Sequence, residues 1–333
     1  MKPQRTFSNI LFLSATSLMT CFHCLNPLQA MCNSDSLKNQ SGTVHHLDGA
    51  LLPVDGGRIW YKIIGDGGRT PVILIHGGPG GSSYYLKPFE DIGTDRKIVR
   101  YDQLGGGKSD KCMDTSLFTI NHFVDELETL RHHLGNDQVY LLGHSFGSII
   151  AVEYYRKYTG HVKGLVLSGA VLDIPALQKN ARDLVATLSD SAQTAIVAAE
   201  AQKKFDTPEY MRACGEFYGK YVMRNPVMTD LDSMMQSTNS LMYAYMQGPS
   251  EFYFTGTLKD YNARPLLPEI KTPVLYTVGE FDEAGQKLVA GFSKMTPRAK
   301  YVVFPGAAHM TSWDARDENV RVVRAFLNEV DAK

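Results

Sequence analysis

The chain has 333 residues, of which 44% are hydrophobic and 21% are charged, and its formal net charge is −1. This length and composition are typical of a globular protein with one large α/β domain and an insertion, or with two small domains. A charge near zero, without a basic stripe, argues against a nucleic-acid partner. Beyond the N-terminus, no run of 18 apolar residues predicts a membrane span in the mature chain.

Residues 1–30 have the order of features found in a secretory signal peptide. Lys2 and Arg5 precede an apolar stretch over residues 10–18, and the segment ends on the small residue Ala30. We therefore expect the mature protein in the periplasm or outside the cell. The alternative is a cytoplasmic protein whose first residues form an N-terminal tail without regular structure.

The cysteines and histidines give no sign of a disulfide framework or of a metal site. Only Cys112 and Cys214 lie in the body of the chain, and two cysteines do not make a framework. Two pairs of adjacent histidines, at 45–46 and 132–133, point to different sides of an element and make poor chelates. We expect no metal site.

The first half of the body alternates predicted strands with predicted helices. Apolar or alternating runs predict strands over residues 43–52, 58–64, 71–75, 97–101, 139–142 and 164–167. Amphipathic spacing predicts a helix over residues 119–134, ended by Gly135, and a further helix begins at Phe146. This order predicts an α/β fold with a mostly parallel sheet and helices on both faces.

The pattern changes over residues 173–261, which have helical spacing and no convincing buried strand. We expect helices over residues 176–188, 194–205, 208–222 and 231–246. Strands over 273–278 and 300–304 and helices over 283–295 and 317–330 then continue the earlier pattern. The sequence therefore predicts a core of residues 43–172 and 262–333, with residues 173–261 inserted as a helical cap.

The turn after residues 139–142 carries the Gly-x-Ser-x-Gly pattern of a nucleophile elbow, with Ser145 at its centre. Side chains at Gly143 and Gly147 would collide with the neighbouring strand and helix, so the pattern needs glycine there. The helix start offers the Phe146 N–H to a developing oxyanion. The alternative is an ordinary strand-to-helix turn that contains a serine.

A serine nucleophile needs a base and a third group that orients the base. Asp282 directly follows one predicted buried strand and His309 follows the next, and α/β hydrolases have the order serine, acid, histidine. We therefore predict a triad of Ser145, Asp282 and His309. Considered alone, Asp282 is interpreted equally well as the N-cap of a helix. His309, considered alone, is interpreted equally well as a loop histidine whose hydrogen bonds are satisfied locally. Asp102 is the second candidate for the acid, and His144 is expected to point away as a structural residue.

A loop with almost no side chains follows the predicted strand 71–75, over residues 76–81. Its backbone can approach a substrate carbonyl closely, so it is expected to supply the second oxyanion donor. The N–H of Gly78 is the first candidate and that of Gly77 the next. A phosphate-binding role is the alternative, but the loop lacks the Gly-Lys-Ser/Thr ending of such loops.

Four motifs together resemble those of a known enzyme family. They are His76-Gly77-Gly78-Pro79-Gly80, Asp102-Gln103-Leu104-Gly105-Gly106-Gly107-Lys108-Ser109, Gly143-His144-Ser145-Phe146-Gly147 and Gly279-Glu280-Phe281-Asp282-Glu283. Together they resemble the proline iminopeptidase family of serine peptidases, above all its tricorn-interacting aminopeptidase branch, over roughly residues 43–331. The resemblance implies an α/β-hydrolase fold with a helical cap, no cofactor, and a short peptide as substrate, from which the N-terminal residue is released.

The resemblance also implies two glutamates that bind the α-amine of the substrate. Glu251, in the motif of residues 248–252, and Glu283, directly after the predicted acid, match these positions. An ammonium group held at a fixed distance from the scissile carbonyl needs paired carboxylates in a desolvated pocket. Without the resemblance, Glu251 is better interpreted as a solvated loop charge and Glu283 as an acid in the first turn of a helix.

Three positions depart from the family pattern. Gly106 stands where many members have cysteine, and we expect packing to explain it. His144 and Phe146 stand where other members have glycine or serine, and tryptophan or tyrosine. Because these two residues flank the nucleophile, they leave the preferred N-terminal residue open, whether proline or another, often apolar, residue.

The sequence as a whole predicts an exported serine aminopeptidase that acts through an acyl-enzyme. A first alternative is another hydrolase of the same fold, an esterase, lactonase or amino-acid amidase, which would not need the two glutamates. An epoxide hydrolase or haloalkane dehalogenase is disfavoured, because those enzymes have aspartate in place of Ser145. A further alternative is a non-catalytic binding protein, and the intact set of Ser145, Asp282 and His309 argues against it.

Overall fold

The computed structural model describes residues 49–333. The predicted signal peptide, the pair of histidines at 45–46 and the first part of the predicted strand 43–52 lie outside the described residues.

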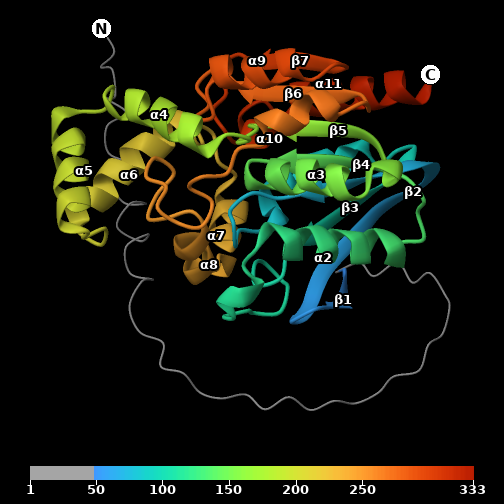
Figure 1. Cartoon of the computed structure of the whole chain (residues 1–333), viewed down its shortest axis with the longest axis horizontal. Coiled ribbons are helices and arrows are strands. Elements are labelled where there is room, and N and C mark those ends of the chain that lie inside the picture. The colour runs from blue at the N-terminus through green and yellow to red at the C-terminus, as the bar shows by residue number, and fades with distance from the viewer. Residues whose placement is uncertain (1–48) are drawn as a thin grey trace, which may run out of the picture. The chain divides into compact units, whose positions relative to one another are not determined.

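A seven-stranded sheet forms the centre of the described part (Figure 1). Its strands are β1 (Ala50–Val54), β2 (Gly57–Ile75), β3 (Arg96–Asp102), β4 (Val139–His144), β5 (Val162–Ser168), β6 (Val274–Gly279) and β7 (Ala299–Phe304). The end of β2 and then β4, β5, β6 and β7 pair parallel in this order, and β1 pairs antiparallel with β2. The predicted mostly parallel sheet is confirmed.

The predicted strands 58–64 and 71–75 are one bent element, β2. Its first half pairs antiparallel with β3, and Ile64 lies opposite Ile98. The chain then turns back, so that Val72 also lies opposite Ile98 and β3 sits between the two halves of β2. Glycine is required in the bend, because a Cβ on Gly67 would lie 2.0 Å from the carbonyl carbon of Asp95.

Helices cover both faces of the sheet, as predicted. On one face, Ile73 and Leu141 pack in a cluster with side chains of α2 (Ile120–His133), α3 (Phe146–Lys157) and α9 (Gln286–Met295). On the other face, Val72 and Leu142 pack with side chains of the 3₁₀ helix η1 (Ser83–Ile92) and of α11 (Arg316–Asp331). Successive strand residues alternate between the two clusters, because side chains of a strand point to opposite faces in turn.

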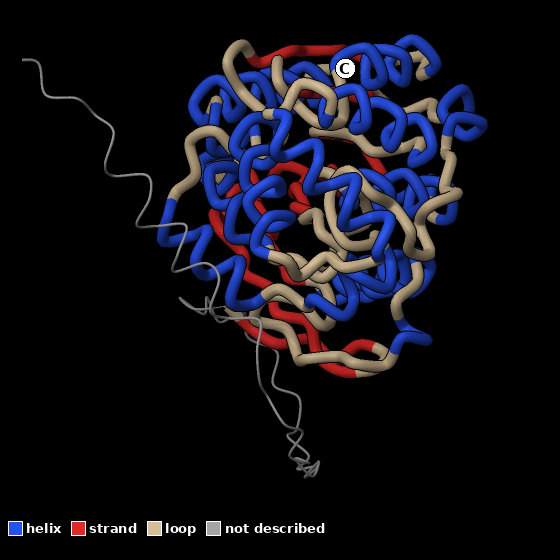
Figure 2. The backbone as a smooth tube through the Cα atoms, turned by 90° about the vertical axis from the view of Figure 1, so that its left-hand side faces the viewer, coloured by secondary structure: helices blue, strands red, loops and turns tan. Residues whose placement is uncertain are grey.

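Five α-helices and no strand lie between β5 and β6 in the described chain. They are α4 (Ile174–Val185), α5 (Asp190–Gln202), α6 (Pro208–Tyr221), α7 (Met228–Ser237) and α8 (Ser240–Met246). Figure 1 shows α4, α5 and α6 together at one end of the sheet, and Figure 2, which faces this side, shows helices in front of the strands. The predicted helical insertion is confirmed, and a bridge between Asp173 and Asn262 joins its two ends.

The helix boundaries differ from the predictions where a polar side chain caps a turn. The predicted helix 231–246 is two helices, α7 and α8, because the side chain of Asn239 accepts a hydrogen bond from the Met242 N–H and starts a new helix. The predicted helix 283–295 begins only at Gln286, because the Asp282 carboxylate accepts from the Ala284 N–H and holds the chain in a turn.

Short elements complete the described chain. They are α10 (Thr311–Asp314), which the sequence did not predict, and the 3₁₀ turns η2 (Thr115–Leu117), η3 (Thr159–His161) and η4 (Arg264–Glu269). Cys112 and Cys214 are buried and unpaired. Over residues 49–333, none of the helices has the length and hydrophobicity that a membrane crossing requires.

Candidate active site

Ser145 lies at a strained turn between β4 and α3. Its φ of 53° and ψ of −124° place a non-glycine residue in a region of backbone space that L-residues rarely occupy. A Cβ on Gly143 would lie 2.3 Å from the Gly147 carbonyl oxygen, and a Cβ on Gly147 would lie 2.2 Å from that of Ile75. The predicted steric need for both glycines is confirmed, and this turn has the geometry of a nucleophile elbow.

Asp282 and His309 meet at the carboxyl ends of β6 and β7. The Asp282 carboxylate lies 2.7 Å from His309 Nδ1 and also accepts a hydrogen bond of 2.8 Å from the Ala284 N–H. Burial alone would raise the pKa of Asp282, but the His309 ring and these hydrogen bonds outweigh it and lower the pKa. Burial would likewise lower the pKa of His309, and the charge and hydrogen bond of Asp282 outweigh it and raise the pKa.

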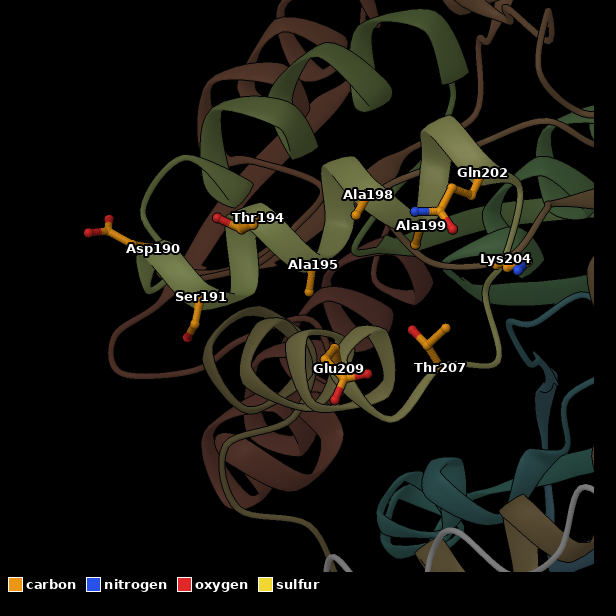
Figure 3. A pocket seen from close by; sticks show the side chains of 10 residues that line it. All are labelled: Asp190, Ser191, Thr194, Ala195, Ala198, Ala199, Gln202, Lys204, Thr207 and Glu209. Carbon is orange, nitrogen blue, oxygen red and sulfur yellow. The ribbon is translucent and has the colours of Figure 1, made fainter.

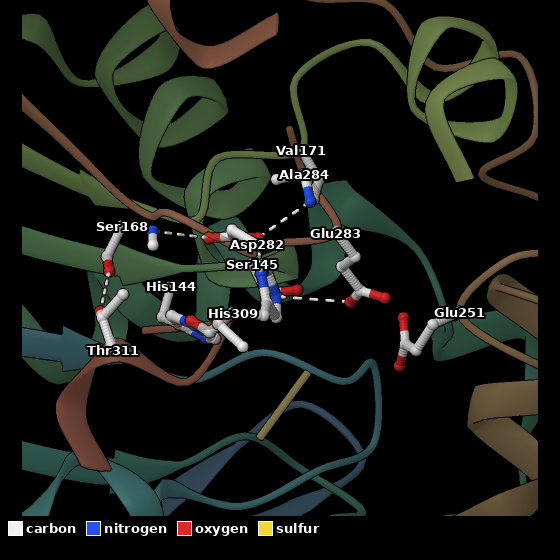
Figure 4. Close-up of polar contacts among 12 residues, drawn as sticks. His144, Ser145, Ser168, Val171, Glu251, Asp282, Glu283, Ala284, His309 and Thr311 are labelled. Atoms are coloured by element: carbon white, nitrogen blue, oxygen red, sulfur yellow. Dashed lines mark hydrogen bonds and ion pairs between the residues drawn. The ribbon is translucent and has the colours of Figure 1, made fainter. Parts of the chain in front are cut away.

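The elbow and the histidine meet at the end of β5. The Ser145 N–H donates a 3.0 Å hydrogen bond to the Ser168 carbonyl, and a Cβ on the next residue, Gly169, would lie 2.7 Å from the His309 ring. His309 Nε2, the ring nitrogen opposite the Asp282 contact, has no hydrogen-bond partner among the described residues. Figure 4 shows Ser145, His309 and Asp282 in one cluster. The structure thus brings the three predicted triad residues together.

The glycine-rich loop after β2 lies against the nucleophile. A Cβ on Gly77 would lie 2.8 Å from the Cβ of Ser145. The Gly77 N–H donates a 2.6 Å hydrogen bond to the Tyr85 hydroxyl, so this donor is already used. The N–H groups of Gly78 and Phe146, the two predicted oxyanion donors, make no hydrogen bond within residues 49–333.

Gly106 packs against this same loop. A Cβ there would lie 2.1 Å from the carbonyl oxygen of Gly81, which is backbone and has little freedom to move. The expected packing role explains why glycine stands at this position, where many family members have cysteine.

The prediction that His144 points away from the site is wrong. Its buried ring lies against the His309 ring, with 4.5 Å between the ring centroids, and its Nε2 lies 2.9 Å from the His309 carbonyl oxygen. The other ring nitrogen lies 2.9 Å from the Tyr85 hydroxyl. The sequence offered one signal for this residue, its place directly before Ser145.

Asp102, the second candidate for the acid, has a different set of partners. One carboxylate oxygen accepts from the N–H and the hydroxyl of Ser83, at 2.7 and 2.6 Å, and the other accepts from the Lys108 N–H at 2.8 Å. Asp102 therefore ties the loop after β3 to the start of η1, and the contact with the histidine belongs to Asp282.

Glu251 and Glu283 face each other beside the histidine, as Figure 4 shows. The buried Glu283 has one carboxylate oxygen 3.8 Å from His309 Nε2 and the other without a hydrogen-bond partner in the described chain. Glu251, which follows α8, accepts from the Tyr243 hydroxyl at 2.8 Å and from Gln247 Nε2 at 2.5 Å. Two carboxylates thus meet, and no cationic side chain of residues 49–333 is hydrogen-bonded to either.

Burial shapes the charge of both carboxylates, and for Glu283 the charge of Glu251 adds to it. Burial, then the charge of Glu251, raises the pKa of Glu283 well above its usual value. Burial also raises the pKa of Glu251, although the hydrogen bond from Tyr243 and the nearby His309 oppose this shift. A cation placed between the two carboxylates would relieve both effects, because it favours their ionised forms.

One carbonyl of the helical insertion holds both loops that carry the site. The carbonyl oxygen of Tyr221, the last residue of α6, accepts from the Glu283 N–H at 3.2 Å and from the His309 N–H at 3.1 Å. The next carbonyl, of Val222, accepts from the Met310 N–H at 2.8 Å. The end of α6 is thereby fixed to the loops after β6 and β7.

A separate hollow lies on the helical insertion, between α5 and the start of α6 (Figure 3). It is lined by Asp190, Ser191, Thr194, Ala195, Ala198, Ala199, Gln202, Lys204, Thr207 and Glu209. None of these residues belongs to the cluster around Ser145. In the part of the chain that the structure describes, no group of three or more metal-binding side chains is placed to hold an ion.

Comparisons with known proteins identify relatives of this chain. The family model of the alpha/beta hydrolase fold matches residues 70–315. A proline iminopeptidase of Heyndrickxia coagulans is 36% identical over 285 residues, which cover 84% of this chain and 98% of that protein. A proline iminopeptidase of Saccharolobus solfataricus is 35% identical over 283 residues, which cover 83% of this chain and 90% of that protein.

Two solved structures are also similar. The crystal structure of VinJ has a TM-score of 0.81 and 29% identity, and the match covers 85% of this chain and 98% of that one. The crystal structure of a proline iminopeptidase of Mycobacterium smegmatis has a TM-score of 0.78 and 29% identity, with 85% and 99% covered. The chain therefore belongs to the α/β hydrolases and, among them, to the proline iminopeptidase family, and it is a serine hydrolase of the prolyl aminopeptidase type.

Proposed function

We propose that the protein releases the N-terminal residue of short peptides through an acyl-enzyme formed on Ser145. The observation that carries this proposal is the pair of facing carboxylates, Glu251 and Glu283, beside a serine, histidine and aspartate cluster. A hydrolase that acts on esters or acylated amides has no use for two buried carboxylates without a cationic side chain as partner. An aminopeptidase needs such a pair to hold an ammonium group.

In the proposed first step, His309 Nε2 takes the proton of Ser145 Oγ while this oxygen attacks the scissile carbonyl. The raised pKa of His309 suits it to this task, because Asp282 stabilises the charged ring that forms. His309 then gives the proton to the leaving amine, the C–N bond breaks, and the acyl group stays on Ser145. Water, activated by the same ring, hydrolyses the ester and releases the amino acid.

We assign the oxyanion hole to the N–H groups of Gly78 and Phe146. Phe146 is the first residue of α3, so its N–H has no intrahelical acceptor, and the helix dipole favours negative charge there. Between the two candidates in the glycine-rich loop, Gly78 is favoured because the Gly77 N–H already donates to Tyr85. Backbone donors of this kind stabilise the charge that develops in the transition state.

We assign the binding of the substrate α-amine to Glu251 and Glu283. Glu283 lies 3.8 Å from His309 Nε2, so an ammonium group bound to it stays within one residue's length of the attacked carbonyl. This geometry restricts cleavage to the first peptide bond. The names of the relatives, proline iminopeptidases, support proline or another apolar residue at the N-terminus of the substrate.

A panel of arylamide substrates tests this proposal. It contains aminoacyl-arylamides with proline and with other residues, their N-acetylated counterparts, and an aryl ester. We expect cleavage of the free-amine substrates alone, complete loss of activity in Ser145→Ala, and labelling of the wild type but not of this variant by a fluorophosphonate. Equal cleavage of acetylated amides and esters would indicate a general hydrolase and refute the aminopeptidase.

We also propose the division of the chain that the sequence predicts, with residues 173–261 as a cap on a core of residues 43–172 and 262–333. The bridge between Asp173 and Asn262 supports these limits, because the chain leaves the core and returns to it at one point. Export of the protein, after removal of residues 1–30, completes the proposal.

A further inference from the structure

Two buried side chains outside the proposed triad join the glycine-rich loop to the base. Tyr85 belongs to η1 and His144 ends β4. The Tyr85 hydroxyl lies 2.6 Å from the Gly77 nitrogen and 2.9 Å from His144 Nδ1, and His144 Nε2 lies 2.9 Å from the His309 carbonyl oxygen. These contacts form one unbroken path from the oxyanion loop to His309.

The donors and acceptors of this path have a single consistent assignment. The His309 carbonyl can only accept, so His144 Nε2 carries the proton and donates it. In a neutral ring Nδ1 then accepts, and the Tyr85 O–H donates to it. The oxygen of Tyr85 in turn accepts from the Gly77 N–H. Every donor meets one acceptor, so the path fixes the tautomer of His144.

The surroundings keep this ring neutral. Burial, and after it the charge of His309, lowers the pKa of His144 to about 3, and these causes outweigh the hydrogen bond to the His309 carbonyl and the charge of Asp282, which raise it. His76, the other imidazole near it, acts in the same direction as His309. The path therefore persists over the whole pH range in which His309 can act as a base.

Both ends of the path lie at reacting groups. Gly77 directly precedes the proposed donor Gly78, and its backbone approaches Ser145 so closely that a Cβ would lie 2.8 Å from that of Ser145. The other end is the backbone of His309 itself. Aromatic contacts also fix the position of the Tyr85 side chain, because its ring packs edge-on against the rings of His144 and Trp313.

We propose that Tyr85 and His144 are positioning residues, which set the oxyanion loop and His309 in the correct relation to Ser145. The inference rests on the proposed function of Gly78 and His309. It gives His144 a role beyond the packing that the sequence suggested, and it gives Tyr85 a role that no motif in the sequence indicated. Neither residue touches the substrate in this proposal.

The variants Tyr85→Phe, His144→Leu and the double variant test the path. Tyr85→Phe deletes one oxygen, so the Gly77 N–H loses its acceptor and His144 Nδ1 its donor. We expect kcat for a free-amine arylamide to fall by about 10- to 100-fold, because small misplacements of reacting groups have effects of this size. KM should change less than threefold. Because both residues act through one path, the double variant should be at most twofold slower than the slower single variant.

Tyr276→Phe is the matched control. It also deletes a buried tyrosine hydroxyl, that of Tyr276 on β6, which shares a 2.9 Å hydrogen bond with Thr296 at the end of α9. We expect it to keep kcat within twofold of the wild type. All variants are assayed well below their melting temperatures. A loss of kcat in Tyr85→Phe that merely follows the unfolded fraction would make Tyr85 a structural residue and overturn the proposal.

Two further results separate this inference from the proposed function. If Ser145→Ala is inactive while Tyr85→Phe has the wild-type kcat, or if the single effects multiply in the double variant, the path is refuted and the triad stands. If Ser145→Ala keeps its activity, the proposed function itself fails. Nitrogen-15 NMR of the folded Ser145→Ala variant should show the proton of His144 on Nε2 from pH 5 to 8, and a proton on Nδ1 would overturn the assignment.

Discussion

Glu251→Gln removes one charge of the proposed amine site and little else. The amide oxygen of glutamine can still accept from the Tyr243 hydroxyl, which donates to the carboxylate at 2.8 Å in the wild type. Gln247, the second partner, can turn its own amide to match the new side chain. The fold should therefore be unaffected, and the change tests charge rather than shape.

The size of the effect depends on both carboxylates. Hydrogen bonds to charged groups stabilise by about 1.5–3 kcal/mol. Without Glu251, the pKa of Glu283 loses one of the influences that raise it, so Glu283 ionises more readily and compensates part of the loss. We therefore expect the variant to lose about 1.5–2.5 kcal/mol of transition-state stabilisation for free-amine substrates, which lowers kcat/KM by about 10- to 70-fold.

The assay compares each free-amine arylamide with a des-amino analogue that lacks the α-amine. Glu251→Gln should lower kcat/KM for the first and leave the slow cleavage of the second within twofold. Glu280→Gln is the control, because it removes the same charge at an exposed position where the side chain accepts from the Gly306 N–H. Equal losses for both substrates, or none for either, would refute the amine site.

Three further predictions concern the acid, a buried carboxyl group and the N-terminus. Asp282→Asn should lower kcat by about 10⁴-fold, and in a pH profile of kcat/KM its acid limb should move to lower pH, because Asp282 raises the His309 pKa; an unmoved limb would contradict this. Burial raises the pKa of Glu126 to about 8. Between pH 4.5 and 8 the folded state therefore keeps a proton on this carboxyl group that the unfolded state has already released. The free energy of unfolding falls as pH rises through this window. Glu126→Gln should therefore add about 3 kcal/mol to the free energy of unfolding at pH 7 and nothing near pH 4, measured with urea; an equal change at both pH values would disprove the assignment. The proposed export predicts that N-terminal sequencing of the active protein begins near residue 31, and an active cytoplasmic protein that retains Met1 would contradict it.

The sequence alone was sufficient to predict those site residues whose chemical role also requires a recognisable local backbone geometry. Ser145 could be found because its strained turn requires glycines two residues before and two residues after it. Asp282 could be found because it lies in the loop just after the fully buried strand β6, and His309 because it lies in the loop after the next strand, β7. Parallel strands bring their carboxyl ends to the same edge, so chain order alone placed these residues near each other.

The partners that come from distant elements could not be read in this way. Tyr85 contacts His144 although the two residues are 59 positions apart in the sequence, and no sequence pattern around either residue predicts the contact. Tyr243 and Gln247 meet Glu251 across a tight turn that follows α8 rather than along a helix. The prediction for the orientation of His144 was wrong for the same reason, since this orientation depends on where the His309 backbone lies.

Local rules failed at two element boundaries as well. Hydrophobic spacing alone does not show that Asn239 breaks a continuous apolar pattern into two helices, because the pattern resumes in the same phase. The merging of two strands into β2 depends on pairing with both edges of β3, which no local pattern encodes.

The double hydrogen bond to the Tyr221 carbonyl sets a limit on how the helical insertion can be exchanged between related enzymes. Since this one oxygen holds the N–H groups of both Glu283 and His309, a transplanted insertion whose α6 ended half a turn earlier would displace the acid and the base together. A chimaera should therefore exchange only α4, α5, α7 and α8, and it should keep Glu251 and the backbone around residues 218–225 of the recipient. Substrate preference could then be varied without loss of turnover.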